Sequence, residues 1–265
     1  LGGDPHPIMV EPLLWPEQEN DIRHAMQSGR WITRPVSEEW GQYIRPLNDF
    51  SELPVNGLWL VQRHQEDLHL NAGHKYALRL YLLIACVEPF TAYLYDEGGM
   101  DICVVPFANG NARDVSRFAF NYDFSVQSRH RDFDPAVHCL SLREWRELLG
   151  EDQALVWNRI KAMLGAALEA IRPTVQRKSA RALPDPGMGF ELIGADVVMD
   201  SALQPWIVEF KRSPSLTQEH CGQIKYRLVE DTARLLLKRR CSDTGVPQPE
   251  IRCGGFDLVC HTGLT

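Results

Sequence analysis

Residues 190–216, FELIGADVVMDSALQPWIVEFKRSPSL, carry the strongest structural signal in the chain. Two apolar runs flank a polar turn at 200–205, which is the pattern of a β-hairpin. Asp196 lies within the first run and Glu209 near the end of the second. A carboxylate on an apolar strand costs free energy unless something compensates it, and Mg²⁺ carrying nucleotide phosphates is a common partner. A plain hairpin with two hydrogen-bonded acids fits these residues equally well.

The same stretch resembles the metal-binding strand pair of the tubulin-tyrosine ligase-like family, which has the ATP-grasp fold. The family pattern is a Gly-x-Asp strand, an Asp at the turn, and then Trp-hydrophobic-Glu-Val-Asn-x-Ser-Pro. The matching residues are Gly194, Asp196, Asp200, Trp206, Glu209, Ser213 and Pro214. Lys211 stands where the family has its Asn.

A second segment, 58–98, resembles the family in the same order along the chain. The match ends in the run YLYDEG at 93–98 and includes Gln62, Gly73, Lys75, Arg79 and Tyr81. Two ordered matches are far more specific than either alone. Weaker similarities lie at 31–35, WITRP, and at 224–232, so the resemblance covers roughly residues 8–240.

The resemblance implies an α/β fold of the ATP-grasp type, with antiparallel sheets flanked by helices and a nucleotide cleft between two lobes. We expect an extended segment at 1–18, the ligase-like domain at 19–240 and a C-terminal tail at 241–265. Residue patterns predict helices at 21–28, 142–149, 153–171 and 218–240, with Ser141 and Glu144 forming a capping box. Pro173 is predicted to end the third helix, a polar loop to follow at 177–189, and the Pro/Gly-rich tail to be weakly structured.

ATP and Mg²⁺ are the cofactors that the resemblance implies. It makes Asp196 and Glu209 the magnesium ligands. Lys75 and Arg79 lie four residues apart on one strand and therefore on one face. In the family these two positions contact nucleotide phosphate and the reacting carboxylate, so we assign them catalytic roles. The alternative for this pair is two surface cations on an edge strand.

Four further residues are predicted to bind the nucleotide. By the resemblance, Gln62 lies at the edge of the adenine-binding strand, and the backbone around Arg63 and His64 meets the adenine. Arg34 precedes the loop that covers the phosphates in the family.

Five family positions are changed in ways that bear on the chemistry. They are Trp40, Tyr43, Ala77, Asp101 and Lys211. A charged lysine has no acceptor lone pair and cannot bind Mg²⁺. We therefore predict that the ammonium of Lys211 takes the place of a second metal ion and pairs with Glu209.

Two functions from different classes follow. The first is an ATP-dependent ligase that adds Glu, Gly or Tyr to a protein carboxylate, such as one of tubulin, through an acylphosphate. The second is a catalytically degenerate relative that acts as a nucleotide- or protein-binding module. A ligase for another peptide or small molecule is a third option. Enzymatic activity stays open at this point.

The composition of the chain limits the classes of molecule that it is expected to bind. A net charge of −7 disfavours nucleic acid, and no apolar run approaches the roughly 20 residues of a membrane span. An acidic protein tail would need a local basic patch, for which 129–131 and 177–181 are candidates, although solvated loop charges explain them too. Seven scattered cysteines indicate free thiols in a reducing, cytoplasmic location, and the resemblance adds association with the cytoskeleton.

Overall fold

The computed structural model describes residues 12–36, 45–65, 67–107, 131–183, 185, 189–216, 222–240 and 249–262. The chain divides into two compact units. The first comprises Leu1–Ala77, Asp101–His138 and Val198–Trp206. The second comprises Leu78–Met100, Cys139–Val197 and Ile207–Thr265.

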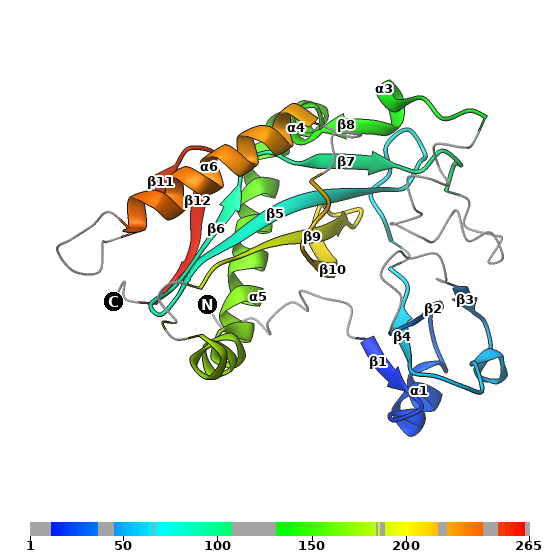
Figure 1. Ribbon diagram of the computed structural model, residues 1–265. Helices are drawn as coiled ribbons and strands as arrows, with labels where there is room; N and C mark the ends of the chain where they lie inside the picture. Colours follow the sequence, from blue (N-terminus) through cyan, green and yellow to red (C-terminus); the bar gives the residue numbers. More distant parts are fainter. Residues whose placement is uncertain are drawn as a thin grey trace. The chain divides into compact units, whose positions relative to one another are not determined.

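A small antiparallel sheet belongs to the first unit (Figure 1). Its strands, in the order β1-β4-β2-β3, are Pro12–Trp15, Trp59–Arg63, Trp31–Pro35 and Arg45–Leu47. Helix α1 (Glu19–Ala25) and the 3₁₀ turn at Phe50–Glu52 accompany the sheet, and the short helix α3 spans Pro135–His138. Apolar side chains close a core beneath it, consisting of Ile22, Trp31, Leu47, Leu53 and Val61.

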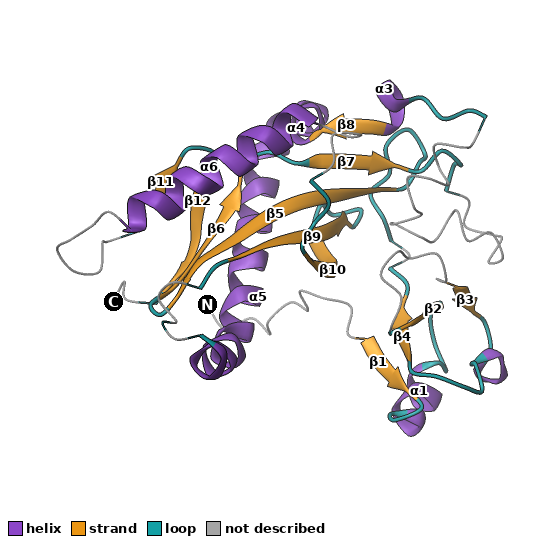
Figure 2. Ribbon diagram, in the orientation of Figure 1, coloured by secondary structure: helices purple, strands orange, loops and turns teal. Residues whose placement is uncertain are grey.

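An eight-stranded sheet dominates the second unit (Figure 2). Six strands follow the order β10-β9-β5-β6-β12-β11, and β7 pairs with β5 and β8. In that order the six strands are Pro205–Arg212, Glu191–Met199, Tyr76–Val87, Phe90–Tyr95, Phe256–His261 and Arg252–Cys253, while β7 is Gly99–Ile102 and β8 is Cys139–Ser141. β5 is antiparallel to both β6 and β9.

Helices α6 (Gly222–Arg240) and α5 (Gln153–Ala182) cover opposite faces of this sheet (Figure 1). Leu228 and Leu235 of α6 pack into one core with Tyr81 and Tyr93 of the sheet. On α5, a Cβ at Gly165 would lie 2.9 Å from the carbonyl oxygen of Val259, so the missing side chain lets α5 lie close to β12. Helix α4 (Leu142–Leu149) precedes α5.

Several predictions from the sequence are confirmed. β9 and β10 form the predicted hairpin. Ser141 caps α4 through the predicted reciprocal bonds with Glu144. Of the predicted helix at 218–240, residues 218–221 lie outside the described part of the chain, and the remainder is α6.

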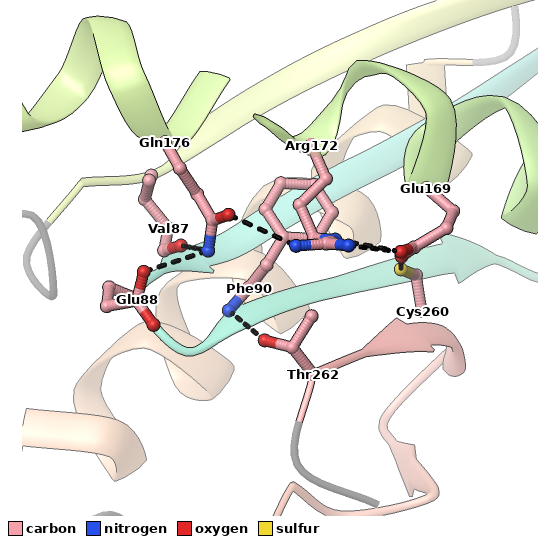
Figure 3. A network of polar contacts seen from close by, with 8 residues as sticks. All are labelled: Val87, Glu88, Phe90, Glu169, Arg172, Gln176, Cys260 and Thr262. Carbon is pink, nitrogen blue, oxygen red and sulfur yellow. Dashed lines mark hydrogen bonds and ion pairs between the residues drawn. The ribbon is translucent and has the colours of Figure 1, made fainter. Parts of the chain in front are cut away.

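The predicted helix end at Pro173 is wrong, because α5 continues to Ala182, across the first half of the predicted polar loop. Proline removes one helix hydrogen bond and crowds the carbonyl four residues earlier. Tertiary contacts compensate for this loss (Figure 3). Beyond the proline, the Gln176 amide donates to the carbonyl of Val87 at 3.1 Å and to Glu88 at 2.8 Å. The helix is thereby attached to the turn between β5 and β6.

The prediction of a weakly structured C-terminal tail is also wrong for residues 252–261. They form β11 and β12, and β12 pairs antiparallel with β6. Phe256 is fully buried and packs on Tyr95, with the ring centroids 4.8 Å apart. Residues 241–248, which connect α6 to this segment, lie outside the described residues. None of the described helices is long and apolar enough to cross a membrane.

Candidate functional site

Arg79 and Asp196 form a cross-strand pair in the second unit. The antiparallel register of β5 and β9 places them directly opposite each other, although 117 residues separate them in the sequence. The guanidinium holds the carboxylate through two bonds, Nε–Oδ1 at 2.5 Å and Nη2–Oδ2 at 3.1 Å. The Asp196 side chain is only 3% exposed. A bidentate bond of this kind is the strong form of an ion pair.

Lys211 joins the two predicted magnesium ligands. Its Nζ lies 3.2 Å from Oε1 of Glu209 and 3.7 Å from Oδ2 of Asp196. The predicted pairing of Lys211 with Glu209 is therefore confirmed. The two carboxylates also lie close together, since both contact one nitrogen. We call Arg79, Asp196, Glu209 and Lys211 the charge cluster; its two cations balance its two anions.

Glycines make room for the charge cluster. Gly194 lies two residues before Asp196 on β9 and so on the same face. A Cβ there would lie 3.1 Å from Cβ of Pro214, 3.5 Å from Cδ of Arg79 and 3.6 Å from Cβ of Lys211. A Cβ at Gly98 would lie 2.3 Å from the carbonyl oxygen of Arg79, which forbids a side chain. The glycines of both sequence motifs thus border Arg79.

Asp200 organises the turn between β9 and β10. Its Oδ1 accepts from the backbone N–H groups of Ala202 (3.0 Å) and Gln204 (2.8 Å). Its Oδ2 accepts from the indole N–H of Trp206 at 3.0 Å. These bonds give two motif residues, the turn Asp and the Trp, a structural role in the hairpin.

A buried pair of bases lies in the first unit. Lys75 directly precedes β5, and its Nζ lies 3.3 Å from Nε2 of His64, which follows β4. Both side chains are buried. Burial lowers the pKa of Lys75 to about 7. Burial, reinforced by the charges of Lys75 and Arg30, lowers the pKa of His64 to about 3. A neutral imidazole nitrogen can accept a hydrogen bond from the ammonium.

The other predicted nucleotide residues lie on the small sheet of the first unit. Gln62 and Arg63 end β4, with Gln62 buried and Arg63 exposed. Arg34 lies on β2, paired in register with Leu60. The structure therefore brings Lys75 next to His64 in one unit, and Arg79 next to Asp196 and Lys211 in the other.

Of the five changed positions, three lie in the described residues. Ala77 is buried in β5, where a charged acid would be costly. Asp101 is half-buried on β7. Lys211 belongs to the charge cluster. Trp40 and Tyr43 lie outside the described residues, as do residues 129 and 130 of one predicted basic patch.

Cys103 was not singled out from the sequence. Its backbone N–H donates to the carbonyl of Lys75 at 2.8 Å, and burial raises the pKa of its thiol. No local sequence signal connects it with Lys75, because they meet only through the fold.

The donor atoms around Asp196 and Glu209 set limits on a metal ion. Across the part of the chain that the structure describes, no three His, Cys, Asp or Glu side chains gather as a metal site. Mg²⁺ is often held by one or two carboxylates together with substrate phosphates. Because Arg79 and Lys211 already neutralise both carboxylates, the pair fits Mg²⁺ only when it arrives with an anion such as a polyphosphate.

The family model and the most similar known proteins identify the same family. The model of the tubulin-tyrosine ligase family matches residues 9–244. A tubulin polyglutamylase of Caenorhabditis elegans is 28% identical over 237 residues, which is 83% of this chain. A probable beta-tubulin polyglutamylase of Tetrahymena thermophila is 25% identical over 88% of the chain, and a tubulin polyglutamylase of Danio rerio is 27% identical over 94%.

These relatives are much longer proteins. The matched regions cover 32%, 21% and 34% of the Caenorhabditis, Tetrahymena and Danio proteins, respectively. The similarity therefore concerns one shared part of each. The mixed architecture of antiparallel sheets and helices is the fold class predicted from the sequence.

Proposed function

This chain belongs to the tubulin-tyrosine ligase family, and on that premise we propose that it is an ATP-dependent ligase that joins glutamate to a carboxylate of an acidic protein tail, such as that of tubulin. Glutamate is favoured over glycine and tyrosine because the relatives named above are polyglutamylases. Action at microtubules would place the protein in the cytoplasm, with the cytoskeleton.

The observation that carries this proposal is the charge cluster. A ligase of this type must neutralise polyphosphate and hold a carboxylate for attack by an amine. Arg79 and Lys211 supply positive charge next to two carboxylates on neighbouring strands. A hairpin that served only as structure would not require four charged side chains at one point of a buried sheet.

Each predicted residue has a proposed task. Asp196 and Glu209 would hold Mg²⁺, which fits them when phosphates accompany it. ATP, when bound, supplies the phosphoryl group that activates the carboxylate. Arg79 would orient the reacting carboxylate, and Lys75 would bind phosphate. The remaining nucleotide contacts are assigned to Arg34, Gln62, Arg63 and His64.

The buried pair supports a phosphate-binding role for Lys75. A lysine held in a dry environment has a weakened hold on its proton, and an arriving anion would strengthen it. The nitrogen next to it belongs to an imidazole whose pKa is lowered to about 3, so His64 adds no like charge at neutral pH.

A second function is favoured by one observation, the bridging position of Lys211. A divalent ion within about 4 Å of an ammonium would be repelled by about 8 kcal/mol at an effective dielectric near 20. A chain that keeps its lysine between the carboxylates would bind nucleotide with fewer metal ions and turn over slowly or not at all. It would then serve as a nucleotide- or protein-binding module.

Nucleotide binding and ligation distinguish the two functions. Calorimetry with ATP, with and without Mg²⁺, should show magnesium-dependent binding that Glu209→Ala abolishes. Labelled Glu, Gly and Tyr are then offered with purified tubulin as acceptor. Incorporation of Glu supports the ligase. Binding without incorporation of any of the three supports the binding module, and unchanged binding by Glu209→Ala contradicts the site itself.

Lys211→Asn tests the metal-mimic role directly. We expect it to raise Mg²⁺ affinity in the presence of ATP by about tenfold, because a repelling charge is replaced by a neutral side chain with an oxygen donor. Titration of Mn²⁺ by electron paramagnetic resonance measures this without reference to activity. The matched control is the neighbouring Arg212→Asn, whose side chain is 91% exposed. Equal Mn²⁺ affinity in wild type and Lys211→Asn would refute the metal-mimic role.

A further inference from the structure

Helix α6 carries apolar side chains on two faces. One row faces the sheet and includes Leu228 and Leu235, which are buried in its core. A second row, spaced three, four and four residues apart, repeats on a single helix face. It consists of Tyr226, Val229, Ala233 and Leu237.

The second row, which we call the outer stripe, is open to solvent. The exposed fractions are 63% for Tyr226, 47% for Val229 and 61% for Leu237. By helical geometry the outer stripe lies on the side of α6 away from Leu228 and Leu235. Single exposed apolar residues are ordinary, but an aligned row on a helix that already buries its other face indicates a contact surface.

The charges of α6 indicate what would bind there. The helix holds six Lys or Arg residues and two acids, whereas the whole chain has a net charge of −7. Both acids take part in ion pairs or hydrogen bonds within the chain. Glu230 pairs with Arg234 at 2.6 Å, and Asp231 accepts from the Tyr95 hydroxyl at 3.1 Å and from the N–H of Gly255 at 3.0 Å. Lys238 pairs with Glu250 at 3.2 Å. By sequence, the helix that carries the stripe nevertheless has an excess of positive charge, whereas the whole chain is acidic.

We propose that the outer stripe of α6 docks an amphipathic helix of a partner protein whose flanking residues are Asp and Glu. Apolar anchors at helical spacing are the mode of helix recognition by a hydrophobic surface, and opposite flanking charges favour encounter and register.

Charge argues against the other occupants. Two copies of α6 would bring together two helices that each carry more basic than acidic residues. An anionic membrane would attract α6 and repel the remaining chain, which is strongly negative. This surface does not depend on the proposed ligase activity, and its test is independent of it.

Two designed peptides provide the probe. Both are helical, with the same leucine stripe, and they differ only in flanking residues, which are Glu in one and Lys in the other. Fluorescence anisotropy with the whole protein should show the Glu peptide binding at least tenfold more tightly than the Lys peptide. Raising salt should weaken the Glu complex, because exposed charges are screened.

The variant Val229→Ser with Leu237→Ser should weaken binding of the Glu peptide by at least tenfold. The matched control is Leu155→Ser on α5, where the leucine is 52% exposed. Circular dichroism melts of all variants separate loss of binding from loss of fold. If only the double variant fails to fold, Val229→Arg, which adds a repelled charge to the stripe, replaces it under the same expectation.

Three results would overturn the proposal. The first is equal binding of both peptides, or of neither. The second is binding that the stripe variants leave unchanged. The third is a preference for another occupant: tighter association with vesicles of phosphatidylcholine and phosphatidylserine than with the Glu peptide, or self-association in sedimentation that the stripe variants abolish.

Discussion

The charge cluster and the buried pair of Lys75 and His64 differ in what lies next to their positive charge. In the cluster, Arg79 and Lys211 are compensated by Asp196 and Glu209. In the buried pair, Lys75 lies next to the neutral imidazole of His64, and burial is the main cause of the lowered pKa of Lys75. Removing one partner of a buried ion pair strands the other charge and costs stability, whereas burial itself disfavours the charged form of Lys75.

The difference teaches what each region can do. The compensated cations of the cluster are locked in place, so they can orient a ligand with little rearrangement. The proton of Lys75 is held loosely at neutral pH, so its charge can respond to an arriving anion. Removing a cation should therefore have opposite effects on stability in the two regions.

The largest expected effect is on the cluster. Arg79→Met should lower the free energy of unfolding by about 3 kcal/mol, because it removes the bidentate partner of the buried Asp196 carboxylate. Urea denaturation measures this. The control is Arg23→Met, which breaks an exposed pair with Glu19 and should cost less than about 1 kcal/mol. Equal losses in the two variants would show that the buried pair is not a stabilising feature.

The next effect has the opposite sign. Lys75→Met should raise the free energy of unfolding at pH 7 by about 2 kcal/mol, because it removes a buried ammonium. The pKa of Lys75 is about 7 in the folded chain, against an ordinary value of 10.5. Between these values the unfolded chain holds a proton that the folded chain has released, so the stability of the wild type rises with pH.

The gain from Lys75→Met should therefore be full below pH 7 and shrink as the pH approaches 10.5. Urea denaturation at pH 7 and pH 9.5 compares the variant with wild type. Lys238→Met, at a side chain that is 60% exposed, is the control and should show no such trend. A constant difference between wild type and Lys75→Met at the two pH values would contradict the loosely held proton.

The smallest effect concerns the space around the cluster. Gly194→Ala should cost about 1 kcal/mol, because its Cβ meets Pro214 at 3.1 Å in a packed sheet. Thermal unfolding measures the loss. Gly99→Ala is the control, since apart from its chain neighbours no residue has a heavy atom within 4 Å of the added Cβ. If Gly194→Ala is as harmless as Gly99→Ala, the close approach at Gly194 does not constrain the cluster.

Local patterns predicted much of the fold. The β9–β10 hairpin follows from two apolar runs around a polar turn, and the cap of α4 follows from Ser141 and Glu144. Pro173 misled the prediction, because the contacts of Gln176 that carry α5 onward come from a distant turn. β12 was missed because its pairing with β6 depends on a partner far away in the sequence.

The sequence by itself determined the hairpin, its two acids, the lysine in place of the asparagine and the family to which these motifs belong. These features are encoded within short windows, where side-chain periodicity and turn residues act locally. Only the tertiary structure decided that Arg79 faces Asp196, that Lys211 reaches both carboxylates and that Lys75 is buried against His64. Such pairings depend on strand register and burial, which arise when distant segments pack together.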